Sequence, residues 1–148
     1  MLLTCNYNSM KAQTTISGGN ASGTWEVEGS PYLIAGSIMV PNDSTLMIES
    51  GVTINFQGSY KLYIQGRIIA LGEINDSINF TTTDSLVGWL GIRFDNTPTT
   101  NDTSKFRYCK FQFGKALYDT AENKGGAFYL NDFSKVIISN CLITILLE

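Results

Sequence analysis

From residue 31 onward, apolar residues recur at every second position, and this alternation strongly limits the possible folds. In the segment TLMIESGVTINF, for example, Val52, Ile54 and Phe56 are separated by Thr53 and Asn55. A spacing of two places alternate side chains on opposite faces of a strand, and strands with one buried face produce this pattern. A helical spacing of three or four is not sustained anywhere in the sequence. The sequence therefore predicts an all-β chain.

The alternation also recurs at a nearly fixed distance along the chain. Three apolar positions lie 16 residues apart, namely Leu46, Leu62 and Ile78. Three glycines fall at intervals of 15, namely Gly36, Gly51 and Gly66. A short period with glycine corners is typical of a β-solenoid, in which each coil buries its inward residues on the next coil. We therefore expect Leu46, Leu62 and Ile78 to stack in one column on successive coils. A β-sandwich is the alternative, but it has no reason to keep such a register.

Similar polar triplets precede several of the apolar runs: Asn42-Asp43-Ser44, Asn75-Asp76-Ser77 and Asn101-Asp102-Thr103, with a looser form at 131–134. Asn and Asp tolerate the left-handed backbone and bond to their own backbone, so we interpret the triplets as corners between strands. Two other interpretations remain open. The three asparagines match the N-glycosylation pattern, which applies in a eukaryotic secretory host. Calcium could bind a ladder made of Asp43, Asp76, Asp102 and Asp132, but the irregular spacing argues against it, and no metal site is assigned.

Composition excludes several classes of function. The 148 residues fit one domain, and a net charge of −3 provides no basic surface for nucleic acid. No run of 18 apolar residues is present, so we expect no membrane span. The chain has no histidine, which excludes Ser-His and Cys-His nucleophiles. The cysteines Cys5, Cys109 and Cys141 are odd in number and lack CxxC spacing, so they predict neither a disulfide framework nor a zinc site.

The two ends of the chain differ in character. Residues 1–30 are polar and glycine-rich and carry Trp25, and we expect them to form a leader and an N-terminal cap. Residues 31–148 are expected to form the solenoid. A lipid anchor on Cys5 is an alternative use of the leader. The last residues, from Cys141 to Leu147, are apolar and end without a polar cap. We therefore expect either a truncated parent chain or a homo-oligomer joined through the C-terminal coil.

The chain resembles the right-handed parallel β-helix proteins of the pectin-lyase-like class, in particular secreted repeat proteins of Bacteroidetes-type bacteria. Three segments carry the resemblance: SPYLIAGSIMVPNDSTLMIESGVTINFQGSYKLYIQGRIIALG, GWLGIRF and GGAFYLNDFSKVIISNC. The resemblance implies an all-β, right-handed parallel β-helix of about five to six coils with an N-terminal cap. It also implies a choice of activities, because this fold includes lyases, hydrolases, adhesins and non-catalytic modules. Only Arg93 and Asp95, two apart on one strand face, look like part of a catalytic site, and an exposed ion pair is the simpler interpretation.

A rigid solenoid presents rows of outward residues, and planar amides and aromatic rings suit the apolar faces and hydroxyls of sugars. The candidate ligand-binding residues are Lys61, Tyr63, Gln65, Lys110, Gln112 and Tyr129. We therefore expect an extracellular, non-catalytic module, secreted or at the cell surface, that binds a polysaccharide or cell-surface glycan or mediates attachment. The alternatives are a polysaccharide lyase or glycoside hydrolase of the pectin-lyase-like class, and a structural spacer.

Overall fold

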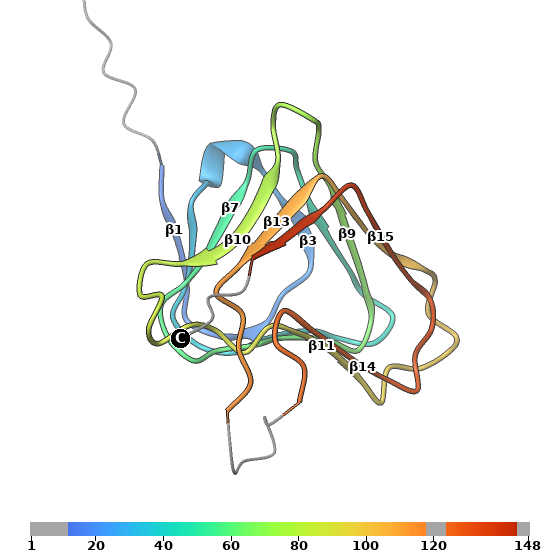
Figure 1. Ribbon diagram of the computed structural model, residues 1–148. Coiled ribbons are helices and arrows are strands. Elements are labelled where there is room, and N and C mark those ends of the chain that lie inside the picture. Colours follow the sequence, from blue (N-terminus) through green and yellow to red (C-terminus); the bar gives the residue numbers. More distant parts are fainter. Residues whose placement is uncertain (1–11, 118–123, 145–148) are drawn as a thin grey trace, which may run out of the picture.

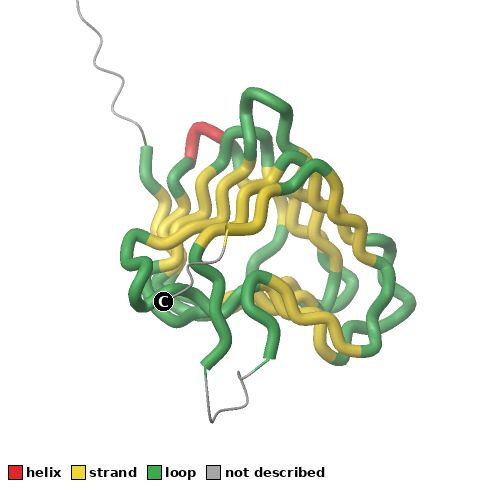
Figure 2. The backbone as a smooth tube through the Cα atoms, viewed as in Figure 1, coloured by secondary structure: helices red, strands yellow, loops and turns green. Residues whose placement is uncertain are grey.

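The computed structural model describes residues 12–117 and 124–144, which form an all-β structure of three parallel sheets. The chain runs through the sheets in turn, so that each coil contributes one strand to each sheet and the next coil lies against it. Viewed nearly along the axis, the coils superpose as a triangle with loops at its corners (Figures 1 and 2). The molecule is therefore a parallel β-helix of about five coils, as the sequence predicts.

Sheet A has six strands: β1 (Thr14–Ile16), β4 (Tyr32–Ile34), β7 (Thr53–Phe56), β10 (Ile78–Thr82), β13 (Cys109–Gln112) and β16 (Leu142–Thr144). Sheet B has five: β2 (Gly19–Asn20), β5 (Ile38–Val40), β8 (Leu62–Ile64), β11 (Ile92–Asp95) and β14 (Phe128–Asn131). Sheet C also has five: β3 (Gly23–Trp25), β6 (Thr45–Ile48), β9 (Arg67–Leu71), β12 (Ser104–Arg107) and β15 (Val136–Ser139). A single-turn 3-10 helix, η1, spans Val27–Gly29. In the described part of the chain, no helix is long and apolar enough to cross a membrane.

The predicted column of Leu46, Leu62 and Ile78 is wrong. All three side chains are fully buried, but they lie on β6, β8 and β10, which belong to three different sheets. Leu46 instead lies opposite Ile68, 22 positions further along the chain, and Leu62 lies between Ile38 and Ile92. The interval of 16 residues separates every second strand in the chain, whereas a coil contains three strands.

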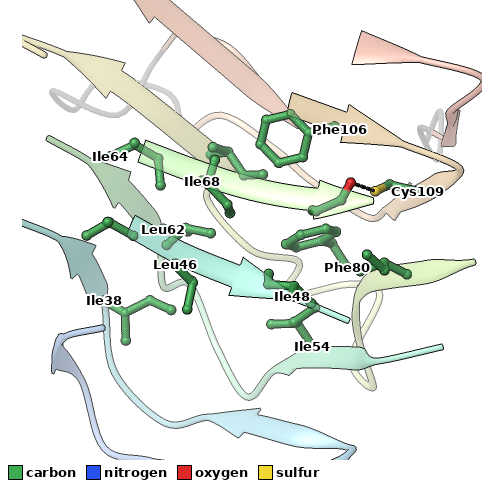
Figure 3. Packing of buried hydrophobic residues seen from close by; sticks show 14 of the residues in the cluster. Ile38, Leu46, Ile48, Ile54, Leu62, Ile64, Ile68, Phe80, Phe106 and Cys109 are labelled. Carbon is green, nitrogen blue, oxygen red and sulfur yellow. Dashed lines mark hydrogen bonds between the residues drawn. The ribbon is translucent and has the colours of Figure 1, made fainter. Parts of the chain in front are cut away.

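The core fills with larger side chains as the coils grow longer. In the first coils most inward positions carry aliphatic residues such as Ile34 and Ile38, although Trp25 stacks on Tyr32. The later coils are packed by aromatic rings, with Phe80 stacked on Phe111 at 4.9 Å between ring centroids. Figure 3 shows the change, from Ile38, Leu46 and Ile54 to Phe80 and Phe106. The later coils are therefore held together by a group of rings that pack on one another across successive strands.

The polar triplets lie at corners between strands, as the sequence predicts. Asp43 and Asp132 adopt the left-handed backbone, with φ of 61° and 54°. Asn101 is buried, and its Nδ2 donates hydrogen bonds to the Asn42 side chain and to the carbonyls of Gln65 and Pro98. The first and third triplets therefore meet at one corner, where the Asn101 side chain connects three successive coils.

The N-terminal end of the β-helix is formed by the first three strands. Strands β1, β2 and β3 pair with β4, β5 and β6, so part of the segment expected as leader and cap forms the first coil.

At the C-terminal end, the side chains of Leu130, Ile138 and Ile143 in the last coil point toward the axis in register with buried residues, yet they are 42%, 41% and 46% exposed. Among the described residues, nothing covers the C-terminal end of the core. Residues 145–147, part of the expected open end, lie outside the described residues.

Candidate functional site

The outer face of sheet B carries a ladder of large side chains. Because inward and outward residues alternate, the buried Ile38, Leu62 and Ile92 leave their neighbours pointing away from the core. The neighbours pair across the strands in the order Met39, Tyr63, Arg93 and Tyr129. A second row begins with Gln65, just after β8, and continues through Asp95 and Asn131. We call these two rows the sheet B face.

An open pocket of about 450 Å³ lies at one edge of the sheet B face, beside the corner that leads to sheet C. It is lined by Met39, Pro41, Asn42, Tyr63, Gln65 and Asn96. The lining combines apolar surface with three side-chain amides and contains no charged residue. Its volume falls within the range of roughly 300–1,000 Å³ for small-molecule sites.

Two hydrogen bonds fix the middle of this pocket. The Tyr63 hydroxyl donates to the backbone carbonyl of Asp95 at 2.6 Å, and Gln65 Nε2 donates to the same oxygen at 2.7 Å. The side chain of Asp95 in turn accepts from Asn131 Nδ2 at 2.8 Å. These contacts connect three successive coils and hold the Tyr63 ring and the Gln65 amide in place. A ligand would therefore meet a surface that is already ordered.

Arg93 and Asp95 are not the exposed pair that the sequence predicts. Both point outward from β11, but Arg93 is only 3% exposed. Its Nη1 donates to the carbonyl of Lys124, and its guanidinium carbon lies 5.7 Å from the centre of the Tyr129 ring. The segment before β14 and the Tyr129 ring thus cover Arg93. The sequence does not predict the burial of Arg93, because the covering segment belongs to the next coil and no spacing in the sequence relates it to Arg93.

The other candidate residues divide between two faces. Tyr129 lies on β14 of sheet B, and Lys61 lies directly before β8 of the same sheet. Lys110 and Gln112 lie on β13 in sheet A. The six candidates therefore do not form one site, and only Tyr63 and Gln65 line the pocket.

Four lining residues were missed by sequence reasoning: Met39, Pro41, Asn42 and Asn96. Asn42 was assigned to a corner, and it does lie at one, but the corner also forms one wall of the pocket. Asn96 follows Asp95 with a left-handed φ of 54°, which turns the chain out of β11 at the pocket edge. Once the coil register is known, Met39 follows directly, because it lies opposite Tyr63.

The cysteine, aspartate and glutamate side chains are the groups to consider for metal binding or nucleophilic chemistry. No group of three or more Cys, Asp or Glu side chains in residues 12–117 and 124–144 is arranged to hold a metal ion. Cys109 and Cys141 are free thiols, and Cys5 lies outside the described residues. The calcium ladder therefore receives no support from the described aspartates.

Comparison with known proteins gives no relative: no protein-family model, no curated protein and no solved structure matches this chain. The fold defines the class, a parallel β-helix solenoid, and no family within that class is assigned.

Proposed function

We propose that this chain is an extracellular, non-catalytic β-helix module that binds a polysaccharide or a cell-surface glycan at the sheet B face. The observation that carries the proposal is the pocket beside Tyr63. Sugar rings present apolar C–H faces edged by hydroxyls, and they are recognised by an aromatic ring flanked by amides. The pocket combines the Tyr63 ring with the amides of Asn42, Gln65 and Asn96 in a rigid setting.

The absence of charge in the lining favours neutral sugars over uronic acid polymers. An anionic polymer is bound through Arg or Lys, because charge-assisted hydrogen bonds to carboxylates are about twice as strong as neutral ones. The guanidinium of Arg93, the nearest candidate in the ladder, is covered by Lys124 and Tyr129. A neutral glycan such as xylan is therefore the first ligand to test.

Replacing Tyr63 by Ala should weaken glycan binding by about tenfold or more, which corresponds to about 1.4 kcal/mol. The change removes the ring and one of the two donors to the Asp95 carbonyl, while the hydrogen bond from Gln65 Nε2 remains. A glycan array identifies the ligand, and titration calorimetry then measures the dissociation constants of the parent and variant chains.

Gln112→Ala on sheet A is the matched control, since it removes an outward polar side chain on the other face. Equal binding by the parent and the Tyr63→Ala chains would contradict the proposed site. An activity screen on pectin, alginate and xylan addresses the alternative. Any unsaturated or shortened product would favour the lyase or hydrolase, whereas absence of both binding and turnover would favour the spacer.

We also propose that two copies of this chain associate through their C-terminal coils. The edges of β14, β15 and β16 end the three sheets, and the half-exposed Leu130 and Ile138 lie among them. Unpaired strand edges around apolar side chains are a template for pairing with another chain. A two-fold contact would cover both ends at once.

Light scattering behind a sizing column should give the mass of a dimer for the parent chain. Ile138→Lys places a charge at the end of the core and should shift the mass to that of a monomer. Ile137→Lys is the control, because Ile137 is 51% exposed but points outward from sheet C. A parent chain that remains monomeric over the whole concentration range would refute the association.

A further inference from the structure

Cys109 and Cys141 occupy equivalent positions on successive coils. Strands β13 and β16 pair in parallel with Lys110 opposite Leu142, so the residues one position earlier also lie opposite each other. The backbone N–H of Cys109 points directly at its neighbour and donates to the Cys141 Sγ at 3.4 Å. No sequence spacing signals this pairing, because 32 residues separate the two cysteines.

The local backbone is also repeated at the two cysteines. Each follows a corner residue in the left-handed conformation, Tyr108 with φ of 47° and Asn140 with φ of 51°. Each thiol donates to the carbonyl two residues before it, at 3.4 Å for Cys109 and 3.2 Å for Cys141. Two side chains that leave the backbone in the same way at adjacent strands lie side by side along the axis.

This arrangement fits the geometry of a cross-link. Neighbouring strands in a sheet are about 4.7–4.9 Å apart. Disulfides join residues whose Cα atoms are about 4.4–6.8 Å apart. We propose that Cys109 and Cys141 form a disulfide that ties the last coil to the coil before it. The inference does not depend on the proposed glycan ligand.

The reaction is a thiol–disulfide exchange with a disulfide of a small thiol or of another protein as the oxidant. A Cys141 thiolate attacks one sulfur of that disulfide, and the other sulfur leaves as a thiolate. The Cys109 thiolate then attacks the Cys141 sulfur and releases the second thiolate of the oxidant. Two cysteine protons and two electrons pass to the oxidant, which leaves as two thiols.

The surroundings fix the order of these steps. Cys109 is 1% exposed, and its Sγ also donates to the Ala70 carbonyl, as Figure 3 shows. Burial raises the pKa of the Cys109 thiol well above its ordinary value, with the neighbouring Cys141 as a second cause. Cys141 is half-buried and closer to solvent. Cys141 therefore meets the oxidant first, and Cys109 closes the bond.

The disulfide would close a ring from Cys109 to Cys141 that contains β14 and β15. These strands form the last coil, whose inward side chains Leu130 and Ile138 are half exposed. A coil that buries little apolar surface is only weakly stable. A disulfide that restricts this segment in the unfolded chain should therefore have a large effect on the stability of the coil.

The test uses the full chain with Cys5→Ser, which leaves only the two stacked cysteines. Incubation with oxidised glutathione at pH 8.5 should remove both free thiols, counted by alkylation and mass spectrometry. A non-reduced digest should contain one peptide pair that joins Cys109 to Cys141. The oxidised chain should melt roughly 10 °C above the same chain after reduction.

Cys141→Ser is the control, and its melting temperature should not change on oxidation. Both thiols remaining free in the folded chain would overturn the proposal, as would a pairing only between molecules. A Cys109–Cys141 disulfide that leaves the melting temperature unchanged or lowers it would overturn the tethering role. The comparison of oxidised with reduced protein uses one sequence, so differences in folding between variants do not enter it.

Discussion

Replacing Phe80 by Ala is expected to lower the free energy of unfolding by about 3–5 kcal/mol. Phe80 is fully buried and lies within one group of rings, 4.9 Å from Phe111 and 6.3 Å from Phe106 and Trp89 between centroids. Removing the ring leaves a cavity that the flanking rings cannot fill, because strand pairing holds Phe111 and Phe106 and the indole N–H of Trp89 donates to the Gln112 carbonyl. Denaturant unfolding followed by tryptophan fluorescence measures the change.

Met47→Ala is the matched control, since Met47 lies on β6 in a middle coil but is 50% exposed on the outer face of sheet C. Its cost should stay within about 0.5 kcal/mol. Similar losses for the two variants would contradict the packing of the aromatic core. The slope of the free energy with denaturant should remain unchanged for Phe80→Ala if all coils unfold together.

The second large effect is expected at Gly66, where an added methyl group would meet backbone of the neighbouring coil. A Cβ at this position would lie closer than 3.0 Å to the carbonyl oxygens of Pro41 and Ser44. Both oxygens are held, because the Pro41 carbonyl accepts from Ser44 N–H and the Ser44 carbonyl accepts from Arg67 N–H. Gly66→Ala should therefore lower the free energy of unfolding by about 2–3 kcal/mol.

Gly58→Ala is the control for this substitution. The nearest atoms to a Cβ on Gly58 belong to the Tyr60 side chain, at 3.1 Å, which can move. Thermal unfolding of the two variants separates a backbone collision from a general effect of glycine replacement. If both variants melt at the same temperature, the close approach of the coils at Gly66 does not limit stability.

The sequence predicts the strands and corners well and the coil poorly, for one physical reason. Alternation reports only whether a residue faces the core, and Leu46, Leu62 and Ile78 all do. A repeated distance along the chain reports that strands and corners have similar lengths. It does not report which strands are neighbours, because that depends on how many strands complete a coil. Two and three strands per coil give the same local pattern.

The candidate site shows the same limit. Tyr63 and Gln65 could be chosen as outward amide and aromatic residues of one strand, and both line the pocket. Lys110 and Gln112 fit the same rule but lie on another sheet. The burial of Arg93 depends on Lys124 and Tyr129, which come from the following coil. Contacts between coils depend on which residues of successive strands lie opposite each other. The alternation of apolar residues in the sequence does not determine this register.

The lengthening of the coils has a consequence for assembly beyond the proposed pair. In the first coil Ile16 lies opposite Ile34, 18 positions later, whereas near the other end Phe111 lies opposite Ile143, 32 positions later. A chain that stacked head to tail would have to set its small first coil on the large last coil of its neighbour. A coil of 18 residues is too short to follow the whole path of a coil of 32 residues, so part of the longer coil would stay uncovered at every junction. Fibres need a unit whose two ends are alike, so this difference in coil length argues against head-to-tail stacking, and the proposed two-fold pair would not extend into a fibre.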